Sequence, residues 1–507
     1  MISHCVLCQT PGHSLVRIMP PTASVRALTI DGGGVRGIIP LRFLAKMQDI
    51  LGSACPVQDL FDVAFGTSAG GLVVLKVFYQ RRPVSECEEK LNNLMVQFFA
   101  NHPPPRTIWS KLIRSIRCWW LDGWYDADFW NELLREEFGS DNCLFDAQPV
   151  SGIKLAVTTV AERPMLLTNY RRVTENSLES GHYHVYEAPD RKSEPRLWQW
   201  ATSAAPIFFP PISIPGVGIC EDGGLKHNNP ALICRAETQL MWTTSPVPGT
   251  LVSLGTGKTA GQLRRSRPRG FAFRLYDSFL ASMDAEQAWD DLLGQLDQLD
   301  RRNYYRLNVT FPNREPLLNA VTQVEWMQRL ADDSAKVHVP NVLSSLLIAC
   351  LFFELSSPPQ LVDGRYHCHG VIRCRLRGKQ WIETFGRLHP EASAYLLGKS
   401  QLDASPFNDA ICTSCARYCV PIRFILNSLD STIVLSLDLG ENQVRHFGGS
   451  PLSLRHIVQR LGLDLIGCSR LAKFPARSEC RACDLRIHRK AAPGSQRSSY
   501  KKRVRFI

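Results

Sequence analysis

The 507-residue sequence lacks any hydrophobic run long enough to cross a membrane as a helix. Its longest apolar run, VLSSLLIACLFF at residues 342–353, is too short for that and is typical of a buried helix or strand. The first 14 residues also lack a basic segment followed by an apolar core, so we see no secretory signal. With 17 cysteines and no such signal, we expect reduced thiols and an intracellular protein, cytoplasmic or peripheral to a membrane.

Acidic residues are scarce at the C-terminal end. Residues 470–507 hold 12 Lys and Arg against 2 Asp and Glu, which accounts for most of the net charge of +12. A basic tail favours an anionic partner, such as a membrane surface or nucleic acid, although an unstructured solubilising tail has the same composition. The rest of the chain is nearly neutral. With 44% hydrophobic residues overall, the chain is long and apolar enough for more than one domain.

The chain shows no evident internal repeat, and its pattern of expected strands and helices changes along its length. We expect an N-terminal arm at 1–23 and, because strands alternate with helices over 24–260, an α/β domain there. Its expected architecture is a three-layer sandwich with a mainly parallel central sheet. A helical extension at 261–340, a C-terminal mixed β-rich domain at 341–468 and a basic tail at 469–507 complete the predicted organisation.

One pentapeptide, Gly-Thr-Ser-Ala-Gly at residues 66–70, fits the G-x-S-x-G pattern between a strand-like and a helix-like segment. A nucleophile on a sharp strand-to-helix turn needs small neighbours, here Gly66 and Gly70, because the backbone is strained and larger side chains would clash. Small-residue turns without chemistry are also common. Its position between strand and helix favours Ser68 as a catalytic nucleophile.

A second glycine turn, Asp-Gly-Gly-Gly-Val-Arg-Gly, lies upstream between another strand and a helix. The amides of Gly32, Gly33 and Gly34 could converge on an anion, either a phosphate or the oxyanion of an acyl transfer. No Lys-Ser/Thr pair follows, as a phosphate loop would require, and glycines for tight packing are the plain alternative. Beside a nucleophile elbow, an oxyanion hole is the favoured interpretation. Arg36 could fix the loop or meet a phosphate.

The third candidate is Asp222, which precedes Gly223 and Gly224 on a predicted turn. A plain Asx-turn is the commonest structure for an Asp-Gly pair. Placed near Ser68, however, a carboxylate can itself act as the base that takes the hydroxyl proton.

A histidine is the usual base of a serine triad. The candidates are His182, His184 and His227, and none has a distinctive setting. From these residues alone, a histidine base and a carboxylate base both stay open.

Five motifs occur in order along residues 25–257: DGGGVRG, GTSAG, ATSAAPIFFPP, DGGLKHNNP and VSLGTG. Together they resemble the patatin-like phospholipase family, and the chain looks similar to its multidomain, fungal-type members. The resemblance implies a Ser-Asp dyad without histidine, with Ser68 as nucleophile and Asp222 as base. It also implies that the glycine loop supplies the oxyanion hole.

The same resemblance implies the chemistry. It predicts a serine acyl hydrolase that cleaves fatty acyl esters of glycerolipids through an acyl-enzyme, with no cofactor and often no calcium. The expected partners are the lipid substrate and a membrane or lipid-droplet surface. The alternative is a non-catalytic module that binds lipid or an anion on the same fold.

Cysteine pairs remain outside this scheme. Cys412 and Cys415 form one Cys-x2-Cys pair, and Cys480 and Cys483 form another, which could together supply the four ligands of a closed zinc site. The 64 residues between the pairs exceed the usual loop, so free buried thiols are favoured and no metal is predicted. A similar pair, Cys5 and Cys8, lies near the N-terminus.

Overall fold

The structure is a computed structural model. It describes residues 2–4, 11–14, 19–100, 127–140, 142, 152–170, 183–186, 196, 199, 212–214, 217–242, 248–259, 285–312, 315–317, 320–440, 443–460, 480–483 and 485. The chain divides into two compact units, one formed by Met1–Met19 and Ser24–Ala349 and the other by Pro20–Ala23 and Cys350–Ile507. The basic tail and the ATSAAPIFFPP motif lie almost entirely outside the described residues.

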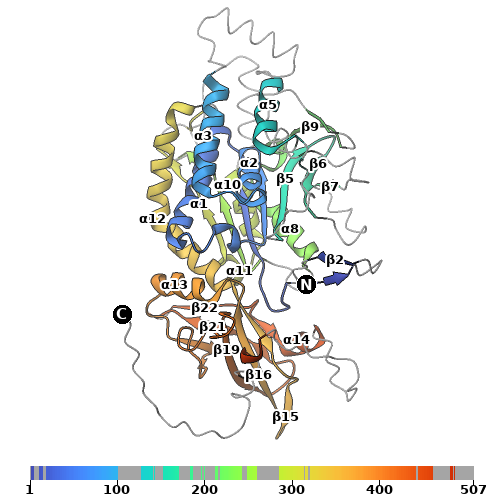
Figure 1. The fold of residues 1–507 in the computed structure, drawn as a ribbon, viewed down its shortest axis with the longest axis vertical. Helices are drawn as coiled ribbons and strands as arrows, with labels where there is room; N and C mark the ends of the chain where they lie inside the picture. The colour runs from blue at the N-terminus through green and yellow to red at the C-terminus, as the bar shows by residue number, and fades with distance from the viewer. Residues whose placement is uncertain are drawn as a thin grey trace, which may run out of the picture. The chain divides into compact units, whose positions relative to one another are not determined.

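The first unit is built on one large sheet (Figure 1). Its main path runs through β12 (Tyr304–Leu307), β10 (Thr250–Leu254), β3 (Arg26–Ile30), β4 (Val63–Thr67), β5 (Lys154–Val160), β6 (Pro164–Thr168) and β7 (His184–Tyr186). Beside this path, β9 (Gly218–Asp222) pairs with β5 and with β8 (Ile212–Ile214). At the N-terminus, β1 (Ile2–His4) and β2 (Pro11–Ser14) form a separate hairpin.

Neighbouring strands from β12 to β5 are all parallel, whereas β6 and β9 are antiparallel to β5. Every residue of β3, β4 and β10 is buried, as expected for parallel strands that are covered on both faces. The predicted mainly parallel sheet is therefore confirmed.

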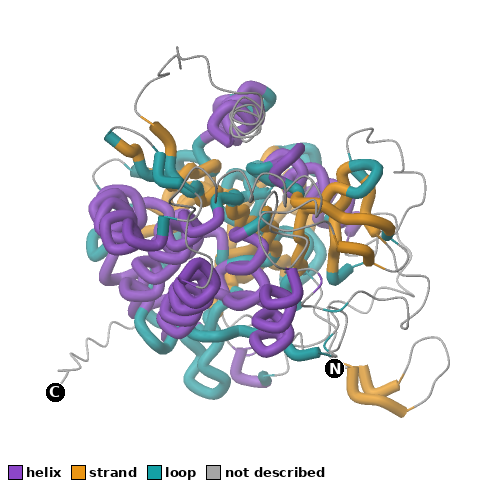
Figure 2. The backbone as a smooth tube through the Cα atoms, turned by 90° about the horizontal axis from the view of Figure 1, so that it is seen from above, coloured by secondary structure: helices purple, strands orange, loops and turns teal. Residues whose placement is uncertain are grey.

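Helices cover both faces of this sheet (Figures 1 and 2). The helices of this unit are α1 (Ile38–Leu51), α2 (Ala69–Val73), α3 (Val84–Ala100), α5 (Ala127–Phe138), α7 (Gly224–His227), α8 (Ala231–Met241), α10 (Ala285–Gly294), α11 (Gln298–Arg301) and α12 (Val324–Ala349). On one face, α8 and α10 pack over Ala27, Phe65 and Ala156. On the other side α1 lies against α3 and α12, and α12 contacts β10 and β12. These layers form the expected sandwich.

The expected helical extension at 261–340 is not helical throughout. Tyr304–Leu307 forms β12, which extends the main sheet beside β10, and Thr310–Phe311 forms β13, which pairs with β11 (Lys258–Thr259). The two adjacent tyrosines, Tyr304 and Tyr305, favour a strand. Strand β10 provides the pairing partner, which the local periodicity of the sequence does not show. Beyond it, α12 passes through Pro340 and ends at Ala349.

The second unit is rich in short strands, as the sequence predicts for a C-terminal β-containing domain. One sheet holds β14 (Leu351–Leu355), β15 (Gln360–Val362), β16 (Arg365–Cys374) and β19 (Cys419–Leu426), and a second holds β17 (Ala394–Leu397), β18 (Ser400–Gln401), β21 (Leu435–Asp438) and β22 (Val444–His446). A small pair, β20 (Thr432–Ile433) and β23 (Leu452–Ser453), and two helices, α13 (Gly378–Leu388) and α14 (Leu454–Arg460), complete it. Trp381 stacks on Phe385 within its core.

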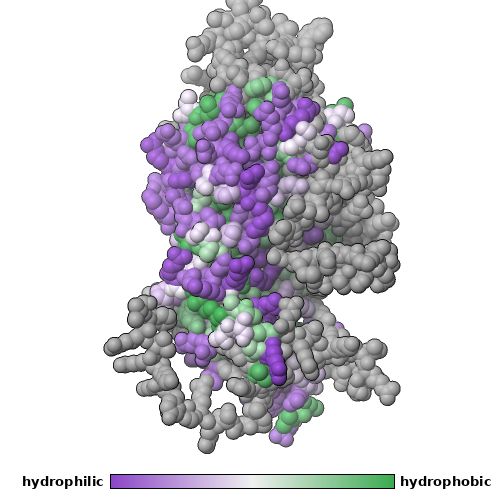
Figure 3. All heavy atoms as spheres, viewed as in Figure 1, coloured by the Kyte–Doolittle hydropathy of each residue, from purple (hydrophilic) through white to green (hydrophobic). Residues whose placement is uncertain are grey.

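No helix in the described part of the chain combines the length and apolar character needed to cross a membrane. On the face shown in Figure 3, the described side chains over the first unit are mainly hydrophilic, with small hydrophobic areas between them.

Candidate active site

The candidate residues gather where strands of the first unit end. Asp31 and the glycine turn follow β3, Ser68 follows β4, and Asp222 is the last residue of β9, opposite Thr159 near the carboxyl end of β5. Ligand sites of open parallel sheets lie at these carboxyl ends. The fold thus brings together three motifs that are distant in sequence.

Ser68 sits on a strained elbow between β4 and α2. Its φ of 53° and ψ of −128° lie in a region that residues other than glycine rarely adopt. A side chain at Gly66 would collide with the carbonyl oxygen of Gly70, and one at Gly70 would collide with that of Ile30. Both glycines are therefore required by close backbone approach, as the G-x-S-x-G pattern predicts.

The glycine turn after β3 packs directly on this elbow. A Cβ at Gly32 would lie 3.0 Å from Cβ of Ser68, and one at Gly37 would lie 2.9 Å from Cβ of Ala69. Only glycine allows the turn to approach the serine this closely. The backbone amides of the turn are thereby held beside the nucleophile.

The three glycine amides are not equivalent. The Gly32 amide donates to the Asn228 carbonyl at 3.2 Å, and the Gly32 carbonyl accepts from Thr256 Oγ1 at 2.7 Å. Gly33 and Gly34 have no amide hydrogen bond to any residue that the structure describes. The turn therefore leaves two amides, rather than three, for a ligand.

Arg36 is buried at 5% exposure and fixes this turn from within. Its Nη1 donates to Glu315 at 2.7 Å, and its Nε lies 3.5 Å from the Gly33 carbonyl. Of the roles considered from the sequence, the geometry favours the loop-fixing one.

Asp31 anchors the base of the glycine turn through a buried cation. Arg306 on β12 donates Nη1 to Asp31 Oδ1 at 3.0 Å and Nη2 to Oδ2 at 2.5 Å, and it also donates Nε to Glu286 at 2.9 Å. Burial raises the pKa of Asp31 to about 6, while Arg306 opposes the shift. The pair joins the strand that the sequence analysis missed to the loop beside Ser68.

Asp222 is 1% exposed, and none of the groups that shift its pKa is a cation. Burial raises the pKa of Asp222 to about 7, and the Gly224 amide, which donates to Oδ1, and the Ser68 hydroxyl both lower it. Oδ2 of Asp222 has no hydrogen bond of normal geometry to any described residue. The carboxylate therefore lies beside Ser68 with one oxygen uncommitted.

Asp222 is held in place by its neighbours. A side chain at Gly223 would collide with Thr158 on β5, so the turn after β9 must press against that strand. Thr67, the residue before the nucleophile, bonds Thr158 Oγ1 at 2.7 Å and donates to the His227 carbonyl at 2.8 Å. These bonds tie the nucleophile strand to the turn that carries the carboxylate.

Two of the three candidate histidines lie within the described residues, on β7 and α7. His184 lies on β7 and its Nε2 is 3.2 Å from Nη1 of Arg163. His227 ends α7 and contributes its backbone carbonyl to Thr67. His182 lies outside the described residues.

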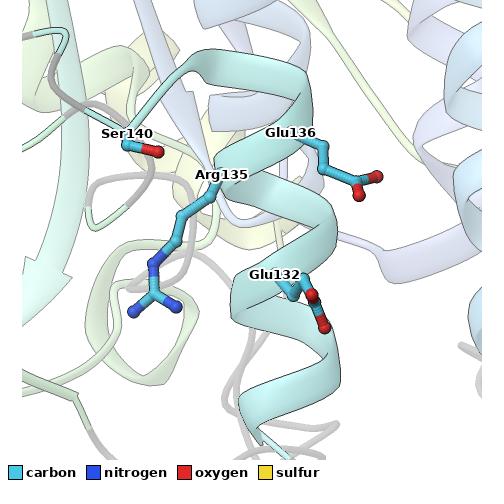
Figure 4. Close-up of a pocket in the computed structure, with 4 residues that line it drawn as sticks. All are labelled: Glu132, Arg135, Glu136 and Ser140. Carbon is cyan, nitrogen blue, oxygen red and sulfur yellow. The ribbon is translucent and has the colours of Figure 1, made fainter.

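One surface hollow lies on α5 and the residues that follow it. Glu132, Arg135, Glu136 and Ser140 line it (Figure 4), and all four are exposed. Three charged, solvated side chains do not suit a fatty acyl chain, because small-molecule sites are mostly apolar and enclosed.

Comparison with known proteins identifies the first unit. Residues 28–235 match the family model of the patatin-like phospholipase. This segment is a patatin-like phospholipase domain. It contains the glycine turn, the serine elbow and Asp222.

Several relatives share this domain. Calcium-independent phospholipase A2-gamma of Oryctolagus cuniculus is 28% identical over 58% of this chain and 35% of its own length. Phospholipase A I of Arabidopsis thaliana is 24% identical over 57% of this chain and 25% of its own length, and Patatin-like protein 3 of the same plant is 29% identical over 49% and 62%. The chain thus spans about a third of the length of its calcium-independent phospholipase relatives.

Sequence reasoning missed two parts of this patatin-like site. The backbone amide of Ala69, at the first position of α2, has no acceptor within that helix. Its place directly after the nucleophile was a signal available in the sequence. The Arg306 anchor had no such signal, because it lies 275 residues from Asp31.

Proposed function

We propose that this chain is a serine acyl hydrolase of the phospholipase A type, which cleaves fatty acyl esters of glycerolipids. The observation that carries the proposal is the placement of Asp222, a buried carboxylate without a cation, beside a strained serine elbow. A base with a pKa of about 7 suits proton transfer near neutral pH. The names of the relatives, calcium-independent phospholipase A2-gamma and Phospholipase A I, support the same class of substrate.

The proposed mechanism gives each group of the candidate site a defined role. Asp222 accepts the Ser68 proton as Oγ attacks the ester carbonyl, and the amides of Gly33, Gly34 and Ala69 receive the developing oxyanion. The alcohol leaves with a proton from Asp222, and water then releases the fatty acid from the acyl-enzyme. Loss of one donor from such an oxyanion hole typically costs about 3 kcal/mol in the transition state. Gly32 serves the hole indirectly, by holding the loop through Asn228 and Thr256.

Binding of the lipid at a membrane or lipid-droplet surface belongs to the same proposal. The basic residues 470–507 would add attraction to anionic lipid of at most about 1 kcal/mol for each Lys or Arg, and salt would weaken it. We propose further that catalysis needs no calcium, as the names of the relatives suggest.

The test is covalent labelling. A fluorophosphonate should label the wild-type chain but not Ser68→Ala. Labelling and hydrolysis of a short-chain ester should persist in a calcium chelator. An unlabelled wild type that still binds lipid vesicles would instead support the non-catalytic lipid-binding alternative.

A further inference from the structure

Two cysteine pairs that are far apart in sequence meet in the second unit. The sulfur atoms of Cys412, Cys415, Cys480 and Cys483 all lie within 4.8 Å of one another. Sγ of Cys412 is 3.7 Å from that of Cys480, and Sγ of Cys415 is 3.5 Å from that of Cys483. Part of the 64-residue gap, which argued against this grouping, is folded into the strands β19 to β23 and helix α14.

The spacing matches one metal geometry. Four thiolates that each lie about 2.3 Å from a tetrahedral zinc are about 3.8 Å from one another. The two measured pairs are close to that edge, whereas a disulfide would need sulfurs about 2 Å apart. The four sulfurs are therefore arranged for a shared ion rather than for two disulfides.

The backbone around the first pair is shaped for thiolates. The amides of Cys415 and Ser414 donate to the sulfur of Cys412. The Cys412 amide donates to the Arg417 carbonyl at 2.9 Å, and the Ala416 amide donates to the Cys412 carbonyl at 2.8 Å. Ala416 adopts a φ of 56°, which a non-glycine residue takes only under constraint. Such a turn aims two side chains at one point and gives charge stabilisation to a bound sulfur.

The surroundings hold the site closed. Cys412 and Cys483 are each 1% exposed and pack with Val371 and Cys419, beside β16 and β19 (Figure 1). The guanidinium of Arg373 lies close enough to Cys483 for their charges to interact, which would offset part of the negative charge of four thiolates. With four protein ligands, no coordination position is left for a substrate.

We propose that Cys412, Cys415, Cys480 and Cys483 bind one structural zinc ion, which fastens residues 480–483 to the β16–β19 region of the second unit. The site is separate from the acyl hydrolase site in the chain and takes no part in ester hydrolysis. Apart from the cysteines themselves, the described residues of this segment contribute only Ala482 to the surrounding apolar cluster. Metal ligation therefore supplies the attachment that side-chain burial alone would give weakly.

The main experiment is metal analysis of the full-length chain, purified under reducing conditions. The wild type should carry zinc, and the double variant Cys412→Ala/Cys483→Ala should carry about one equivalent less. Cys419→Ala is the matched control, because Cys419 is buried in the same cluster but its sulfur is not one of the four. Equal zinc in the wild type and the double variant, or iron in place of zinc, would overturn the proposal.

Two further measurements do not depend on whether the double variant folds. Cys480→His keeps a zinc ligand and should retain more metal than Cys480→Ala. In the unmutated chain, zinc should be removable by a chelator, and titration with Co²⁺ should then produce the visible spectrum of a tetrahedral thiolate complex. An apo chain that takes up neither Zn²⁺ nor Co²⁺, or one in which these cysteines form disulfides under reducing purification, would refute the site.

Discussion

Two buried carboxylates of the first unit have the same exposure and opposite settings. Asp31 and Asp222 are each 1% exposed, and each stands at the end of a strand of the same sheet. Burial raises the pKa of both, to about 6 for Asp31 and about 7 for Asp222. The difference lies in their partners, because Asp31 receives two bonds from Arg306 whereas Asp222 receives one from the Gly224 amide.

This difference assigns each carboxylate a distinct role in the proposed mechanism. Both oxygens of Asp31 are occupied by a guanidinium, so Asp31 can anchor the glycine turn but cannot readily accept a proton. Oδ2 of Asp222 has no hydrogen bond of normal geometry within the described residues, and Ser68 lies beside it. A buried oxygen that is left uncommitted next to a hydroxyl is what a general base requires.

The largest effect is expected at Asp222. Asp222→Asn should lower kcat/KM on a short-chain ester by about a thousandfold, because an amide is a far poorer proton acceptor than a carboxylate. Ser68→Ala should abolish the activity, and the double variant should be no worse than Ser68→Ala, since both groups serve one step. Circular dichroism should show unchanged folding.

A measurement of thermal stability distinguishes loss of the base in Asp222→Asn from general damage to the fold. At pH 8 the wild type buries a charged Asp222 without a cation, and Asp222→Asn removes that charge. The melting temperature of Asp222→Asn at pH 8 should therefore equal or exceed that of the wild type. A folded Asp222→Asn enzyme that kept most of its activity would disprove the proposed base.

The next effect is expected at Asp31, with the opposite balance between stability and activity. Asp31→Asn leaves Arg306 buried with Glu286 as its remaining carboxylate, which should cost about 3 kcal/mol of folding stability. The displaced glycine turn should lower kcat/KM by about a hundredfold.

Thermal denaturation and ester kinetics measure both effects. Asp49→Asn removes an exposed partner of Lys46 and should change neither quantity. If Asp31→Asn kept the folding stability of the wild type, the ion pair between Asp31 and Arg306 would not stabilise the fold.

Much of the geometry of the candidate site was predictable from sequence, because it is encoded locally. Ser68 needs glycines two residues away on each side, and the turn at residues 31–37 needs glycines to approach it. Such constraints act over a few residues and leave a pattern in the chain. The parallel sheet was predictable for the same reason, since its strands are short apolar runs between helices.

Long-range pairings could not be predicted. Arg306 reaches Asp31 because β12 joins the edge of the sheet, and the periodicity of its neighbours indicated helix instead. The Asn228 carbonyl that occupies the Gly32 amide also comes from a distant turn. The second cysteine pair, 64 residues further along the chain, also meets the first through the tertiary fold. In each case, tertiary pairing rather than local sequence decides the contact.

A smaller and reversible effect should come from pH. Because Asp222 must be deprotonated to act as the base, kcat/KM should rise with pH through about 7 and fall about tenfold for each unit below it. Stability should move the other way. A carboxyl whose pKa is raised from 3.8 to about 7 in the folded state favours folding at low pH, and this contribution is lost as pH rises through 7.

The control is the Asp222→Asn variant, whose residual activity should lose this inflection. A wild-type profile that is flat between pH 5 and pH 8 would argue against Asp222 as the titrating group.

The smallest effects should come from the histidines. His184 on the edge strand β7 contacts Arg163, and His227 accepts from Thr67 through its backbone carbonyl, which alanine retains. His184→Ala and His227→Ala should each change kcat/KM by less than about threefold, because neither removes a group that accepts the Ser68 proton. His182→Ala is the third variant of the set. Steady-state kinetics with folding checked by circular dichroism decide the matter: one inactive, folded histidine variant would replace the dyad with a triad, and Asp222 would then be the residue that orients that histidine.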